Sequence, residues 1–169
     1  MQELLRKSAM EQFSAIKDKK VSATELTKAS LERIHSIDEK LGAFNSLTET
    51  TALETAKKVD EKVAAGEELP LLAGVPLALK DNMNLIGSRT TASSKILENF
   101  VSPYNATVTQ KLLDNLIPIV GKANLDEFAI VSLNNTVSCN TIAIVFLKSS
   151  FGISLILTPS NNISPLSTS

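Results

Sequence analysis

Apolar residues recur at three- and four-residue steps through the first 66 positions, which is the spacing of amphipathic helices. The first stripe consists of Leu5, Ala9, Phe13 and Ile16. A second helix should begin at residues 22–25, where Ser and Glu three positions apart form a capping box, and should end at Gly42. A third should begin at a similar box in residues 51–54 and end at Gly66. The pattern thus predicts a helical lead-in over residues 1–66 that packs on another part of the chain.

The period changes after this lead-in, where short apolar runs replace the helical stripes. Residues 74–79 are apolar and precede the polar sequence Lys-Asp-Asn, as expected of a buried strand. Residues 105–107 open a helix, and residues 116–121 form a second apolar run. A strand, a helix and a second strand are the unit of a parallel sheet. Residues 71–129 are therefore predicted to start an α/β core, with a further helical start at 124–128.

Overall composition excludes several classes of protein. The 169 residues carry 17 basic and 18 acidic side chains and are 43% hydrophobic, as in a soluble globular domain. A net charge of −1 argues against a protein that binds nucleic acid without a partner. One cysteine, Cys139, and one histidine, His35, cannot supply a disulfide framework or a typical zinc site. The charged N-terminus does not resemble a signal peptide, so we expect a cytoplasmic protein.

Charge is unevenly distributed along the chain. Residues 1–128 hold 16 of the 17 basic and all 18 acidic residues, whereas Lys148 is the one charged residue after them. A solvated surface normally carries more charge than that, so we divide the chain into an N-terminal part, 1–129, and a divergent tail, 130–169. The elements predicted in the tail are strands at 141–147 and 153–157 and a disordered end at 159–165. Its apolar residues 142–157 are too few to span a membrane.

Lys80 is the residue that the pattern favours for chemistry. It directly follows the first predicted strand, and open α/β sheets bind ligands beyond the carboxyl ends of their strands. Partial burial at such a position lowers the pKa of a lysine and lets its neutral amine act as a base. The alternative is a surface lysine paired with its neighbour Asp81. Asp126 and Glu127 point about 100° apart on a helix and suit a first helical turn, and His35 is expected to be solvated.

Four ordered blocks of the sequence resemble the amidase signature family. They are residues 74–82 (GVPLALKDN), 90–97 (TTASSKIL), 104–108 (YNATV) and 121–129 (GKANLDEFA). The resemblance implies the N-terminal portion of an α/β fold in which helices cover a mixed β-sheet. It also implies amide hydrolysis by a Ser, a second Ser in a cis peptide and a Lys. It places Lys80 at the position of that Lys, which takes a proton, through the bridging Ser, from the nucleophilic Ser.

Within this family, residues 94–100 and the helical lead-in are most similar to the A subunits of tRNA-dependent amidotransferases. That resemblance implies that ammonia from glutamine converts glutamyl-tRNA(Gln) into glutaminyl-tRNA(Gln). The implied partners are the B and C subunits, and the misacylated tRNA would be reached through the B subunit. No membrane is implied as a partner. ATP and Mg would be used by the B subunit, and no cofactor would be bound by this chain.

The sequence also departs from the family pattern. The family continues after the fourth block into a Gly-Gly-Ser-Ser-Gly-Gly-Ser segment and later a nucleophile segment, and neither occurs here. Residues 149–152 and Ser154 place serines near where the first of these segments would fall, but the flanking glycines that would supply backbone amides to an oxyanion hole are absent. Residues 116–118 are apolar where the family has a Glu-Ala-Gly-like turn.

Because the missing segments coincide with the change in charge, we hypothesise that a shifted reading frame or gene decay joined the start of an A subunit to an unrelated tail. A truncated chain of this kind should lack glutaminase activity. Two alternatives stay open. One is a general amidase fragment acting on small amides, which would need no B and C subunits. The other is a non-catalytic module that binds those partners.

Overall fold

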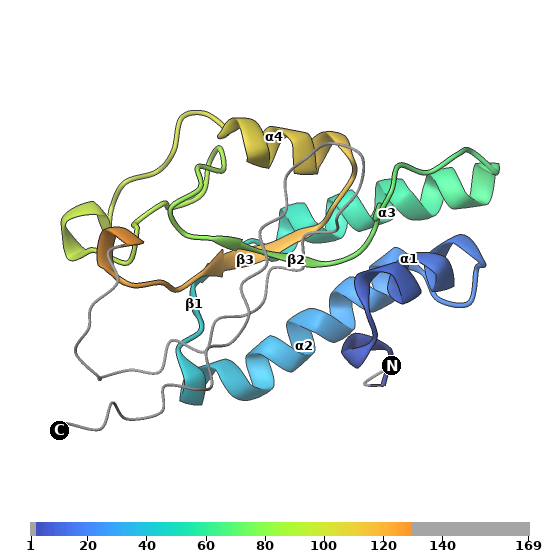
Figure 1. The fold of residues 1–169 in the computed structure, drawn as a ribbon, viewed down its shortest axis with the longest axis horizontal. Coiled ribbons are helices and arrows are strands. Elements are labelled where there is room, and N and C mark those ends of the chain that lie inside the picture. The colour runs from blue at the N-terminus through green and yellow to red at the C-terminus, as the bar shows by residue number, and fades with distance from the viewer. Residues whose placement is uncertain (1–2, 130–169) are drawn as a thin grey trace, which may run out of the picture.

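The computed structural model describes residues 3–129, which form a mixed sheet with helices on both sides (Figure 1). In this part of the chain the α-helices are α1 (Ala9–Lys17), α2 (Ala23–Leu41), α3 (Glu49–Ala65) and α4 (Thr107–Asp114). The strands are β1 (Phe44–Leu47), β2 (Leu77–Lys80) and β3 (Ile119–Ala123). Short 3-10 helices cover Leu4–Arg6, Lys95–Leu97 and Glu127–Ala129.

Helix α2 begins and ends where the sequence predicts. The Ser22 hydroxyl accepts a hydrogen bond from the Glu25 amide at 3.0 Å, and the Glu25 carboxylate accepts one from the Ser22 amide at 2.9 Å. This capping box satisfies amides that the first helical turn leaves without a partner. Gly42 ends the helix in the left-handed conformation, with φ of 58°. The first helix is shorter than the apolar stripe Leu5–Ile16 predicts. Leu5 lies in a 3-10 turn, and α1 starts at Ala9.

Residues 44–47, between the second and third predicted helices, form a strand, β1, that the helical pattern of the lead-in does not predict. This strand pairs antiparallel with β3, with Phe44 opposite Ala123 and Leu47 opposite Gly121. A four-residue strand that contains Asn and Ser has too little alternation to be distinguished in the sequence, so its partner strand decides its conformation. Gly121 permits the close approach, because a Cβ at this position would lie 2.7 Å from the backbone oxygen of Ser46.

Helix α3 begins at Glu49, so the capping box predicted at residues 51–54 is wrong. Thr51 lies inside the first turn, where its hydroxyl donates to the carbonyl of Thr48 at 3.0 Å. Pairing of β1 fixes the start of the helix instead. The Thr48 amide donates to the Val120 carbonyl at 3.0 Å, and the Thr48 hydroxyl donates to the Ile119 carbonyl at 2.6 Å. The helix ends before Gly66, as the sequence predicts.

Strands β2 and β3 pair in parallel and α4 lies between them in the chain, which confirms the predicted strand-helix-strand unit. The sheet order is β1-β3-β2, with β1 antiparallel, so the sheet is mixed as the fold class requires. Both parallel strands begin three residues later than predicted, at Leu77 and Ile119. The reason near the second strand is a turn at Leu116, whose φ is 56° and whose carbonyl accepts a hydrogen bond from the Gly74 amide at 2.9 Å.

Consecutive residues of β3 contact different layers. Ile119 packs with Leu79 and, through the same cluster, with Leu112 of α4. Val120 instead packs with Leu31 of α2 and Ala52 of α3. Side chains alternate between the faces of a strand, so α4 covers one face of the sheet and α2 and α3 cover the other, as Figure 1 shows.

A separate apolar core joins the first three helices to the loop before β2. Its buried members are Phe13, Ile16, Val21, Ala23, Leu26, Ala56, Val59, Ala73 and Val75. Gly74 lies in this core with φ of 81°, and a Cβ there would be 2.7 Å from the Cβ of Ala23. Asp60 of α3 adds a polar link, because its carboxylate accepts the Ala23 and Thr24 amides at 2.7 and 3.0 Å. A carboxylate at this position also opposes the positive end of the α2 dipole.

The helical start predicted at 124–128 is a single 3-10 turn, Glu127–Ala129, in which Phe128 has a left-handed backbone (φ 52°). The strands predicted at 141–147 and 153–157, the end at 159–165 and Cys139 lie outside the described residues. Between residues 3 and 129, no helix combines the length and hydropathy needed to cross a membrane.

Candidate functional site

Lys80 is the last residue of β2 and lies opposite Ala123 of β3 in the parallel register. It therefore occupies the carboxyl end of the parallel pair, as the sequence predicts, although inside the strand rather than after it. Its side chain is partly exposed. The ion pair with Asp81 that the alternative interpretation expected is not formed, because Asp81 is completely buried and its carboxylate contacts Lys122 instead. Lys80 takes part in none of the ion pairs found within residues 3–129.

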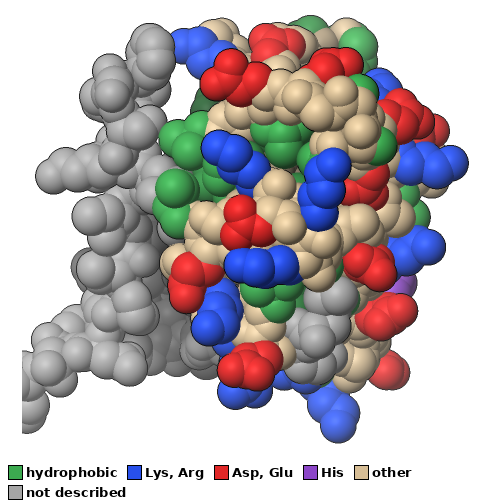
Figure 2. Space-filling view, turned by 90° about the vertical axis from the view of Figure 1, so that its right-hand side faces the viewer, with side chains coloured by type: hydrophobic (Ala, Val, Ile, Leu, Met, Phe, Trp, Pro, Cys, Tyr) green, Lys and Arg blue, Asp and Glu red, His purple; other side chains and the backbone are tan. Residues whose placement is uncertain are grey.

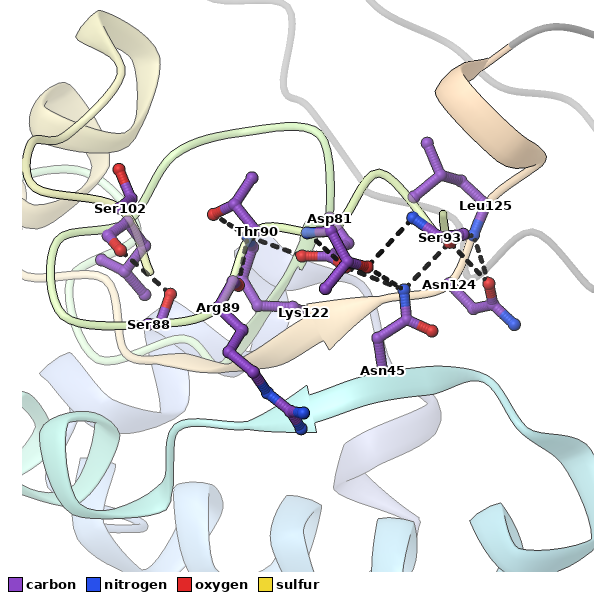
Figure 3. A network of polar contacts seen from close by, with 12 residues as sticks. Asn45, Asp81, Ser88, Arg89, Thr90, Ser93, Ser102, Lys122, Asn124 and Leu125 are labelled. Atoms are coloured by element: carbon purple, nitrogen blue, oxygen red, sulfur yellow. Dashed lines mark hydrogen bonds and ion pairs between the residues drawn. The ribbon is translucent and has the colours of Figure 1, made fainter. Parts of the chain in front are cut away.

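Asp81, the residue after β2, and Lys122, near the carboxyl end of β3, form a fully buried ion pair (Figure 3). The Lys122 Nζ donates to Asp81 Oδ1 at 2.9 Å, to Thr90 Oγ1 at 3.0 Å and to the Arg89 carbonyl at 3.3 Å. These contacts satisfy all three protons of the ammonium group. Burial lowers the pKa of Lys122, and the hydrogen bond and negative charge of Asp81 oppose that effect.

The second oxygen of Asp81 is equally well satisfied. Its Oδ2 accepts hydrogen bonds from Asn45 Nδ2 at 2.8 Å, from the Thr91 hydroxyl at 2.6 Å and from the Thr91 amide at 3.2 Å. Asn45 reaches this oxygen from β1, at the point where the pairing of β1 with β3 changes register between Phe44 and Ser46. Such irregularities redirect a side chain from its regular position on a strand. The carboxylate is thus enclosed by donors from three segments of the chain.

Ser93 extends the network to the segment after β3. Its hydroxyl donates to Asn124 Oδ1 at 2.8 Å and accepts hydrogen bonds from Asn45 Nδ2 at 2.9 Å and from the Leu125 amide at 3.1 Å. Ala92 and Ser93 both have left-handed backbones, with φ of 48° and 55°. These contacts hold the unusual turn against the end of the parallel pair, as the sticks in Figure 3 show.

Two further contacts join the same turn to the last described residues. The Ser94 hydroxyl donates to Glu127 Oε1 at 2.6 Å, and the Phe128 amide donates to the Ala92 carbonyl at 3.0 Å. Two of the blocks noted in the sequence, residues 90–97 and 121–129, therefore lie side by side at the carboxyl ends of β2 and β3. Glu127 has a side-chain partner here in addition to the helix-end role that the sequence suggests.

Sequence reasoning did not single out Asn45 or Lys122. Asn45 gives no periodic signal, since it is a polar residue in the short connection between two predicted helices, where no strand was expected. Lys122 follows an apolar run in the same way as Lys80, and this repeated pattern of strand and lysine is the signal that could have identified it. His35 is exposed, as expected, and its Nε2 lies 3.1 Å from Glu49 Oε1.

Lys80 is not among the residues that line the cavity near the start of α3. This cavity, of about 600 Å³, lies where the start of α3 meets the loop at residues 85–89, and Thr48, Glu49 and Arg89 are among its lining residues. Figure 2 shows acidic and basic side chains interspersed over one face of the molecule, with apolar side chains between them. Among residues 3–129, no three His, Cys, Asp or Glu side chains gather closely enough to hold a metal ion.

A family model described as Amidase matches residues 25–141, which is more than half of the chain. The chain belongs to the amidase family. The matched range includes Lys80 and the whole network around Asp81 and Lys122, so the site lies in the amidase part of the chain. The resemblance stated from the sequence blocks is thereby confirmed.

Two curated relatives of this amidase chain carry the same name. A protein from Carboxydothermus hydrogenoformans, named as the A subunit of glutamyl-tRNA(Gln) amidotransferase, is 49% identical over 130 residues, which cover 77% of this chain and 27% of the relative. A protein of the same name from Trichormus variabilis is 54% identical over 114 residues, covering 68% of this chain and 24% of the relative. The amidase chain thus spans about a quarter of the length of the curated relatives it matches.

Solved structures show the same fold. One belongs to a vestigial protein complex that reveals the origins of an s-triazine catabolic enzyme, with a TM-score of 0.70 and 31% identity over 72% of this chain and 27% of that one. Another is a peptide amidase in complex with the competitive inhibitor chymostatin, with a TM-score of 0.68 and 30% identity over 73% and 26% of the two chains. The described residues therefore have a partial amidase-signature fold.

Proposed function

We propose that this chain provides the N-terminal part of the amidase core of a glutamyl-tRNA(Gln) amidotransferase A subunit. The observation that carries the proposal is the identity of 49–54% to proteins of that name over 114–130 residues of this chain. In the complete protein the amidase core would release ammonia from glutamine. The B and C subunits would be partners, with ATP, Mg and the misacylated tRNA handled by the B subunit.

Lys80 is the proposed catalytic base of this reaction. It lies at the carboxyl end of a parallel strand, it is partly exposed, and it is not part of an ion pair within the described residues. A neutral amine within hydrogen-bond reach of a hydroxyl group can take its proton and activate the oxygen as a nucleophile. The serines of the family mechanism would come from segments that this sequence does not contain, so the 169-residue chain alone should not hydrolyse glutamine.

A chimera tests both parts of the proposal. Residues 1–129 of this chain would replace the corresponding residues of the Carboxydothermus hydrogenoformans relative, and the product would be combined with B and C subunits. We expect the chimera to release glutamate and ammonia from glutamine and to amidate glutamyl-tRNA(Gln). Lys80→Met should reduce glutamine hydrolysis by about 10²–10⁴-fold, because a positioned base contributes on that order.

The matched control is Lys57→Met, which removes an exposed lysine of α3 and should leave the activity unchanged. A folded chimera that assembles with B and C but retains full activity after Lys80→Met would refute the catalytic role of Lys80. A chimera that hydrolyses small amides and does not bind B and C would favour the general amidase. Binding of B and C without hydrolysis would favour the interaction module.

A further inference from the structure

Lys80 and Asp81 are neighbours in sequence with opposite charges, yet the structure keeps them apart. Asp81 and Leu79 are both buried, and alternation along an extended strand directs the intervening Lys80 to the other side. The Asp81 carboxylate is occupied by one ammonium group, one amide side chain, one hydroxyl and one backbone amide. A carboxylate with this set of donors has no free site for a second cation.

Without its partners, Asp81 would act on Lys80 at short range. Adjacent Cα atoms are about 3.8 Å apart, and an unpaired carboxylate on the neighbouring residue favours the charged form of an amine. That charged form is the ammonium, which cannot accept a proton from a nucleophile. The positive charge of Lys122, 2.9 Å from Asp81, cancels most of this effect.

We propose that Lys122 and Asn45 are positioning residues for Lys80: they occupy the Asp81 carboxylate and so leave the Lys80 amine without an adjacent counter-charge. This inference rests on the proposed role of Lys80 as a base. Apart from Lys80, the charged side chains in residues 77–90 and 119–128 are Asp81, Arg89, Lys122, Asp126 and Glu127. Of these, Asp81 alone is both fully buried and adjacent to Lys80 in the chain.

The test measures the reactivity of Lys80 in the full 169-residue chain, without glutamine or partners. The chain is acetylated with trace acetic anhydride at about pH 8, and peptide mass spectrometry gives the rate for Lys80 relative to Lys57. Since the neutral amine alone reacts, this ratio reports the share of neutral Lys80. We expect the ratio to fall about tenfold in Lys122→Met and to return to within about twofold of the original in Asp81→Asn/Lys122→Met.

Each outcome decides the proposal. An unchanged ratio in folded Lys122→Met would overturn it, and so would a fall of equal size in the double variant, because Lys122 would then act through packing alone. If Lys122→Met does not fold, Asn45→Ala/Thr91→Val replaces it. That variant removes two donors from Asp81 and should lower the ratio about threefold, and an unchanged ratio would again overturn the proposal. Because no glutamine is hydrolysed in this test, its result is independent of the chimera experiment.

Discussion

The ammonium group of Lys122 lies 2.9 Å from the carboxylate of Asp81, and both side chains are completely enclosed by the protein. The pair connects the residue after β2 to the carboxyl-terminal part of β3, and its remaining hydrogen bonds involve Asn45 of β1 and residues 89–91. Burial of two charges is costly, and here the cost is offset by three hydrogen bonds from the ammonium and three further ones to the carboxylate.

Breaking this pair should destabilise the chain strongly. Lys122→Met leaves the Asp81 carboxylate buried without a counter-ion, and we expect a loss of about 3–5 kcal/mol in the free energy of unfolding, measured with urea. The double variant Asp81→Asn/Lys122→Met removes both charges and should recover most of that loss. A double variant as unstable as the single one would show that the contribution comes from the shape of Lys122 rather than from its charge.

Asp60 should stabilise the contact between α2 and α3. Asp60→Ala removes the acceptor of the Ala23 and Thr24 amides and a negative charge at a helix N-terminus, so we expect a loss of about 1–2 kcal/mol in thermal or urea unfolding. Glu61→Ala, at an exposed position one residue later, serves as the control for helix propensity and charge. Equal effects of the two substitutions would contradict the capping role.

Gly74 should be required for close packing as well as for its backbone conformation. Gly74→Ala places a Cβ 2.7 Å from the Ala23 Cβ and 3.0 Å from Val59, and should cost about 1–3 kcal/mol more than Gly66→Ala. Gly66 has a similar φ, 73° against 81°, but a Cβ there would meet nothing within 4 Å. The two variants therefore share the backbone strain and differ in the steric clash, which calorimetry of both would separate.

The capping box of α2 should make stability depend on acid. Hydrogen bonds from the Ser22 amide and then the Ser22 hydroxyl hold the pKa of Glu25 below its ordinary value of 4.5. A lowered carboxyl pKa stabilises the folded chain above the unfolded pKa, and this contribution is lost as the pH falls through the folded pKa. The Tm of the original chain should exceed that of Glu25→Gln at neutral pH, and the difference should shrink as the pH falls below 4.5 and through the lowered pKa of the folded chain.

Glu32→Gln, in the middle of the same helix, controls for the loss of one negative charge in this pH series. A Tm difference for Glu25→Gln that stays constant from neutral to acid pH would mean that the ionised carboxylate does not contribute to the cap.

Local signals predicted α2 and the parallel strand pair well, because capping residues and apolar runs act over a few positions. The same approach failed for β1 and for the start of α3. The sequence of β1 is compatible with helix or loop, and the pairing of Ser46 with Lys122 and the hydrogen bond from the Thr48 amide to the Val120 carbonyl decide between them. The starting points of β2 and β3 also depend on a turn at Leu116. This turn has a left-handed backbone at a residue that is not glycine, so the sequence gives no sign of it.

The sequence by itself determined the family, the α/β class and the placement of Lys80 at the carboxyl end of a strand, since all of these follow from motifs and periodicity along the chain. Tertiary structure alone decided which lysine pairs with Asp81. The nearest cation in sequence is Lys80, but alternation along the strand turns it away, and the parallel register brings Lys122 from 41 positions further along into hydrogen-bond contact. The register of β2 and β3, rather than adjacency in the sequence, therefore decides which lysine contacts Asp81.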